Sequence, residues 1–272
     1  IYLKFLNYKL IILKMTENNI LKFNFFYKVF VYFVILLLFE GIFHFYYYII
    51  SQKIDFIPFK NQTGYNSIIW SENGLVEFLQ IIFLLISAIF LVKFIKKTFN
   101  NINIILKTFI IMYLLGILYY FFEEISWGQH IFGWQTQEFF SNINSQNEIN
   151  IHNTSSLFNE LPRNLLLIWC SLSFIFVKIL KTEFFSLKYI IFPNKNLKFI
   201  SILILIFFVP DLLVDKLDLA PGHPAANDTE ILLNIFFEII SFNFVRLSEL
   251  QELLFNFYIL WHSYYLNKVK LS

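Results

Sequence analysis

Long apolar runs limit, more than any other feature, what this chain can fold into. A helix that crosses a bilayer needs about 20 mostly apolar residues, whereas a helix on the surface of a soluble domain carries a polar face. Five runs are long enough or nearly so, and the last of them is short and contains Pro210, which predicts a kink or an early end. These runs are residues 29–50, 75–94, 104–122, 164–180 and 199–214.

The C-terminal region is long enough for two helices, of which we expect only the second to cross the membrane. Its first half places Asn234, Glu238 and Ser241 on one helical face. Such a polar stripe is typical of a helix that lies at the membrane surface or packs against a bundle. The sixth predicted span is therefore residues 249–266, and a seventh span at residues 231–245 is the alternative.

The composition agrees with this interpretation. The chain is 58% hydrophobic and 15% charged, whereas a soluble domain is about one quarter charged. The predicted fold class is an all-α polytopic transmembrane helical bundle of six spans. A cytoplasmic N-terminal segment, residues 1–28, precedes a single transmembrane domain, residues 29–272. The first methionine is Met15, so residues 1–14 carry no weight here.

Basic residues set the orientation of the predicted spans. In the six-span arrangement, 16 of the 21 lysines and arginines fall on one side of the membrane, and without residues 1–14 the ratio is 13 to 5. Because positively charged loops stay in the cytoplasm, both termini are predicted to be cytoplasmic. We expect a multipass protein of a bacterial inner membrane, in contact with the lipid bilayer. A seventh span would place Lys268 and Lys270 outside.

Acidic residues and histidines gather at the predicted outer side, most densely in residues 123–130 (EEISWGQH) at the end of the third run. Ionisable residues in a membrane are costly, so they usually pair, face a cavity or serve a function. A continuous helix would place Glu123, Trp127 and His130 on one face, and Ser126 on the face of His130. The two adjacent glutamates would point different ways, one into the bundle and the other towards the interface.

These residue types suit acid–base or metal chemistry. A desolvated carboxylate is a good general acid or base, and carboxylate oxygens and imidazole nitrogens are ordinary zinc ligands. The alternative role is anchoring or helix-end hydrogen bonding, because interfacial belts of membrane proteins hold similar residues. The predicted catalytic residues are Glu77, Glu123, Glu124, Ser126 and Gln129, and the predicted ligands of a divalent metal such as zinc are His130 and His152.

Other polar residues are weaker candidates. Glu249 and Glu252 begin the sixth span and are possible additions to the same site. Glu40 and His44 lie one helical turn apart, which indicates a packing pair or, alternatively, a proton path. We expect His223 to be a loop residue. His262 is expected to lie in the core or at the membrane interface, and the single cysteine, Cys170, to pack in the core.

Two stretches resemble an uncharacterised family of bacterial multipass membrane proteins. They are residues 123–134 (EEISWGQHIFGW) and residues 144–153 (NSQNEINIHN). The resemblance covers the chain from the second span onward and implies that these residues form one site, without implying an activity. In that family an arginine stands at the position of His130 and a glycine at that of Asn147, which puts the importance of His130 in doubt.

Fainter similarities exist to two characterised families. The adjacent Glu123 and Glu124 resemble the glutamate pair of CAAX-protease-like intramembrane proteases, but the arginine expected after the pair is missing. The histidine spacing does not reproduce the zinc-binding set of the alkaline ceramidase and adiponectin-receptor superfamily. We therefore infer no membership in either family.

Three hypotheses of function follow from these residues. The first is a membrane-embedded hydrolase or transferase that acts on a lipid-linked or membrane substrate at the periplasmic leaflet. The second is a proton-coupled transporter, and the third is a structural or assembly subunit whose outer loop docks a membrane-protein partner. The chain has no glycine-rich phosphate loop, no zinc-helix motif and no nucleophile elbow, and nothing in it indicates nucleic-acid binding.

Overall fold

The computed structural model describes residues 25–39, 69–70, 74–143, 149–151, 154–179, 191, 197–216 and 247–268. Within these ranges every regular element is a helix and no strand occurs, which confirms the all-α prediction. The chain divides into two compact units. The first contains Ile1–Met15, Glu77–Ile204 and Leu253–Ser272, and the second contains Thr16–Val76 and Leu205–Glu252.

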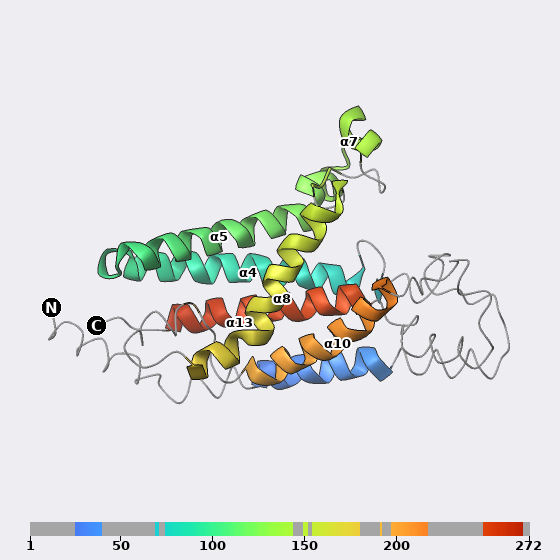
Figure 1. Ribbon diagram of the computed structural model, residues 1–272. Coiled ribbons are helices and arrows are strands. Elements are labelled where there is room, and N and C mark those ends of the chain that lie inside the picture. The colour runs from blue at the N-terminus through green and yellow to red at the C-terminus, as the bar shows by residue number, and fades with distance from the viewer. Residues whose placement is uncertain are drawn as a thin grey trace, which may run out of the picture. The chain divides into compact units, whose positions relative to one another are not determined.

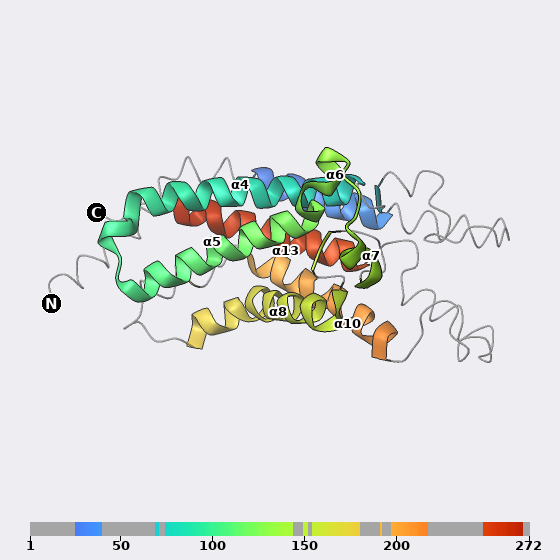
Figure 2. The same ribbon diagram turned by 90° about the horizontal axis from the view of Figure 1, so that it is seen from above.

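A helical hairpin forms one side of the first unit. Helices α4 (Leu75–Thr98) and α5 (Ile104–Glu124) are joined by the short η1 (Phe99–Asn101) and run side by side in both views (Figures 1 and 2). Asn103 caps α5, because its Oδ1 accepts a hydrogen bond from the backbone nitrogen of Leu106 at 2.9 Å. This cap lets the chain leave η1 and begin a helix of apolar residues at once.

Helix α13 (Leu247–Lys268) contributes its later part to the same unit. Residues 253–263 are all buried, so this stretch is covered on every face. Its contacts with α4 include the rings of Phe83 and Phe257, with centroids 5.9 Å apart. At the other end, Lys97 Nζ donates to Asn267 Oδ1 at 3.0 Å. Residues 253–268 of α13 therefore form the centre of the first unit.

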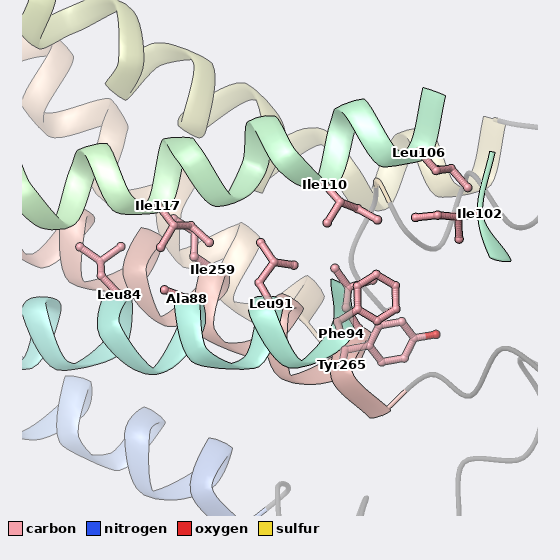
Figure 3. Close-up of a cluster of buried hydrophobic side chains, with 11 residues drawn as sticks. Leu84, Ala88, Leu91, Phe94, Ile102, Leu106, Ile110, Ile117, Ile259 and Tyr265 are labelled. Atoms are coloured by element: carbon pink, nitrogen blue, oxygen red, sulfur yellow. The ribbon is translucent and has the colours of Figure 1, made fainter. Parts of the chain in front are cut away.

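The apolar core of the first unit lies where α4, α5 and α13 meet. Figure 3 shows Leu84 and Leu91 of α4 below Ile110 and Ile117 of α5, with Ile259 of α13 next to them. Leu84 and Leu91 are fully buried. Because their neighbours come from all three helices, this cluster holds the hairpin against α13.

Helices α8 (Ser156–Ile179) and α10 (Lys198–Lys216) add a polar and aromatic layer. The rings of His262, Tyr113 and Trp169 all contact one another, with centroids 5.4–5.6 Å apart. Ser201 Oγ donates to the backbone oxygen of Cys170 at 2.7 Å, and so ties α10 to α8. Both His262 and Cys170 are fully buried, which confirms that they belong to the core.

The predicted helices match the observed ones closely, with two differences. Helix α8 begins at Ser156, before the predicted start at Asn164, and contains Pro162. A kink or an early end was predicted at Pro210, and of these the early end was wrong, because α10 continues past Pro210 to Lys216. A proline removes one backbone donor, and this helix tolerates that loss without ending. The helix Phe25–Phe39 covers part of the first predicted span, and residues 40–50 lie outside the described residues.

Two of the described helices are long and apolar enough to cross a membrane, Leu75–Asn101 and Ile104–Glu124. The helices Phe25–Phe39 and Lys198–Phe208 are apolar but shorter. Large apolar side chains also remain exposed along the helices. On α5 they include Ile104, Ile111, Met112, Leu115 and Phe122, and on α8 Leu157, Leu161, Leu165, Ile168 and Ile175. The number of crossings and their direction stay predictions.

The core cluster generates a stability prediction. Leu91 is fully buried on α4, whereas the neighbouring Val92 is exposed on the same helix. Leu91→Ala leaves a cavity and should lower the free energy of unfolding by about 2–5 kcal/mol. Val92→Ala should change it by about 0.5 kcal/mol or less. Thermal unfolding of both variants in one detergent measures the difference, and equal losses would contradict the packing in Figure 3.

Candidate functional site

The chain changes direction sharply where α5 ends. Ser126, Trp127 and Gly128 have φ angles of 45°, 52° and 95°, so three consecutive residues lie in the left-handed region. A non-glycine residue there costs roughly 1–2 kcal/mol. These residues form η2 (Ser126–Gly128), which precedes the short helix α6 (Gln129–Phe132). The prediction of one continuous helical face through His130 was therefore wrong.

The buried carboxylate of Glu123 stabilises this turn. Its Oε1 accepts a hydrogen bond from Trp127 Nε1 at 2.6 Å, and its Oε2 accepts one from the backbone nitrogen of Ile151 at 2.7 Å. The side chain is only 3% exposed. Hydrogen bonds to a charged acceptor are stronger than neutral ones, particularly in a low-dielectric setting. Glu123 thus offsets the strain of the turn. It also fixes the segment around Ile151, which we call the returning segment because the chain comes back there to the end of α5.

Gln129 holds the same returning segment. Its Oε1 accepts a hydrogen bond from the backbone nitrogen of Ile149 at 2.8 Å, and its Nε2 donates to Thr136 Oγ1 at 2.8 Å. Glu123 and Gln129 therefore accept hydrogen bonds from two amides of one short segment, those of Ile151 and Ile149. We call these two side chains and two amides the side-chain clamp.

Two glycines make the turn possible. Gly128 has a positive φ, and a Cβ there would lie 3.1 Å from the ring of Phe132 and 3.2 Å from that of Trp134. Gly133, with φ of 67°, ends α6, and its nitrogen donates to the backbone oxygen of Gln129 at 2.8 Å. Close ring packing and left-handed backbone both exclude larger residues at Gly128.

Three other predicted site residues lie in the same unit. Glu124 is half-buried whereas Glu123 is buried, so the two adjacent carboxylates do differ in environment, as predicted. Ser126 is buried within the turn. Glu77 lies in the first turn of α4. Because α4 and α5 form a hairpin, that turn lies at the same end of the hairpin as Glu123 (Figure 2).

The remaining predicted residues lie outside the described residues or in the second unit. The side chain of His130 and the whole of His152 lie outside the described residues, as do Glu40, His44 and His223. Glu249 and Glu252 belong to the second unit. Among the described residues no group of three or more histidines, cysteines or acidic residues could hold a metal ion. The metal site at His130 and His152 stays a prediction.

Sequence reasoning missed the backbone partners of Glu123 and Gln129. Glu123 and Trp127 were expected to share one face of a helix, whereas their hydrogen bond is made across a turn. The donors at Ile149 and Ile151 are backbone amides, which almost every residue has, so the residue types at these positions do not indicate the contact. Gly128 and Gly133, which flank α6, were the available indication that the helix ends before residue 128.

No protein-family model matches the chain, and no curated protein and no solved structure matches it significantly. The resemblance to a family of bacterial multipass proteins therefore stays a prediction that rests on residues 123–134 and 144–153.

The side-chain clamp generates a prediction for Glu123→Gln. A carboxamide has one acceptor oxygen, so it can serve only one of the two donors that Glu123 serves now. A buried donor left without an acceptor costs about 1–3 kcal/mol. We expect faster hydrogen exchange at the amide of Ile151 and a lower unfolding temperature.

The control is Glu138→Gln, which removes an exposed carboxylate on the neighbouring helix α7 (Glu138–Ile143). Its exchange at Ile151 should equal that of the unmodified protein. Unchanged exchange at Ile151 in Glu123→Gln would show that Glu123 does not hold the returning segment.

Proposed function

We propose that this chain is a multipass protein of a bacterial inner membrane that crosses it six times with both termini in the cytoplasm. We further propose that it acts at the outer leaflet as a hydrolase or transferase on a lipid-linked or membrane substrate. The support for membrane embedding is the length of α4 and α5 together with apolar side chains left exposed along them. Soluble monomers rarely expose apolar patches that extensive.

The observation that supports a site is the pair of carboxylates at the end of α5. Glu123 is buried, and its two oxygens accept hydrogen bonds from two neutral donors, the indole of Trp127 in the turn and the backbone amide of Ile151. The adjacent Glu124 is half-buried and thus more accessible to a substrate. We therefore assign Glu123 as a positioning residue and Glu124 as the general base.

In this mechanism the nucleophile is the oxygen of a water molecule or of a substrate hydroxyl. Glu124 takes the proton from this oxygen while the oxygen attacks an ester or phosphoester of the lipid. The bond to the leaving group breaks, and the protonated Glu124 returns the proton to that group. Glu123 contributes by fixing the turn that carries Glu124, so that the base stays in one place. No step depends on a metal at His130 and His152.

The second candidate is an assembly subunit, and the side-chain clamp favours it. Glu123 and Gln129 each accept one hydrogen bond from a backbone amide of residues 149–151, which holds this short segment near the end of α5. A segment held in this way can present a fixed surface to another membrane protein. Turnover by the purified protein distinguishes the two.

The activity test uses the full chain in vesicles of a bacterial polar lipid extract, with lipid composition followed by mass spectrometry. We expect conversion of at least one lipid class by the unmodified protein. Glu124→Gln should abolish it without changing the unfolding temperature, and the exposed-site control Glu138→Gln should retain it. Conversion by Glu124→Gln at an unchanged rate, or none by the unmodified protein, would overturn the enzymatic proposal.

The orientation is tested by cysteine labelling in a Cys170→Ala background, which removes the only natural thiol. Asn100 and Gln137 are exposed near opposite ends of α5. An impermeant maleimide added to intact spheroplasts should label Gln137→Cys at once and Asn100→Cys only after permeabilisation. The reverse pattern would invert the proposed orientation, and labelling of both from outside would exclude a crossing by α5.

A further inference from the structure

Four aromatic side chains surround the turn after α5. Phe122 and Trp127 stack, with ring centroids 5.4 Å apart and an interplanar angle of 14°. Phe132 and Trp134 are in contact, at 5.0 Å, and both lie against Gly128. All four are exposed, Phe132 to 69%. We call Phe122, Trp127, Phe132 and Trp134 the aromatic collar.

Trp127 differs from an ordinary surface tryptophan in the direction of its N–H group. An indole usually sits where its apolar ring can leave water while its N–H keeps a polar partner outside. Here Nε1 donates inward to the buried carboxylate of Glu123, at 2.6 Å. The exposed part of the ring, 42% of the residue, therefore carries no polar atom that needs water.

The conformation of the turn is what presents this ring. Ser126 and Trp127 both have positive φ angles, which are unfavourable for residues with a side chain. The hydrogen bond to Glu123 and the stacking on Phe122 hold Trp127 in that conformation. The strained backbone of Ser126 and Trp127 is thus what leaves the apolar face of the Trp127 ring exposed.

The collar continues a surface that already faces away from the core. The exposed apolar residues of α5 run along one side of the helix from Ile111 and Leu115 to Phe122, and Phe122 stacks on Trp127. This face of α5 is apolar apart from the hydroxyl of the half-buried Tyr119, so one kind of neighbour suits its whole length. Under the proposed membrane embedding, on which this step rests, that neighbour is lipid.

We propose that the aromatic collar inserts into the outer leaflet of the bilayer, with the ring of Trp127 against the first carbons of the acyl chains. Glu123 acts as the positioning residue of this anchor. It accepts the hydrogen bond of the indole N–H, so that this polar group points towards the protein and not towards the lipid. The collar thereby holds the side-chain clamp, and Glu124 beside it, at the depth of the lipid headgroups.

The test is tryptophan fluorescence of the full chain in phosphatidylcholine vesicles brominated either near the headgroup or near the chain end. The emission of Trp127 is the difference between the unmodified protein and Trp127→Phe. We expect bromines near the headgroup to remove most of this difference emission and bromines at the chain end to remove much less. Glu123→Ala, which removes both acceptor oxygens, should weaken that depth dependence, and Glu138→Gln should leave it unchanged.

Vesicle flotation of the same samples separates the two proposals. Protein that floats with the vesicles but whose Trp127 emission responds to aqueous iodide and not to bromine would overturn the collar and leave membrane embedding standing. The same would follow if Trp127 were shielded from both quenchers, because a protein partner or second copy would then cover it. Protein that fails to float would overturn membrane embedding itself.

Discussion

The buried carboxylate of Glu123 is the group on which the end of the α4–α5 hairpin depends. A buried charge is tolerated only when donors replace the water that it has lost. Glu123 obtains one donor from the side chain four residues later and the other from a backbone amide 28 residues later. One side chain therefore fixes both a local turn and a distant segment, and the desolvation cost of the charge is what makes the two cooperative.

The helices could be predicted where a single property decides them. Long apolar runs identified α4, α5 and α13 with nearly the observed bounds, because length and hydropathy do not depend on tertiary context. The start of α8 was missed because residues 156–163 mix polar and apolar side chains and include a proline. The burial of His262 followed from its place in an apolar segment, but its contacts with the rings of Tyr113 and Trp169 did not.

The site was predictable as a set of residues but not as an arrangement. The density of polar groups in residues 123–130 singled out Glu123 and Gln129, because such groups are expensive next to long apolar helices. Helical periodicity then assigned the wrong geometry, since it ignores a left-handed turn at Gly128. Pairing of Gln129 with Ile149 joins a side chain to a backbone amide 20 residues away, and no local pattern encodes that contact.

The complete burial of residues 253–263 has a consequence for biosynthesis. These residues follow α4, α5 and α8 in the chain, yet they fill the space at the centre of the first unit. The ribosome therefore synthesises the central helix of this unit after the helices that surround it. Until that happens, side chains such as Leu84 and Ile117 need a temporary cover, from lipid, from each other or from a chaperone. A chain truncated before α13 would lack its central helix permanently. The apolar side chains that normally contact α13 would stay uncovered, which would make the truncated protein a substrate for quality-control proteases.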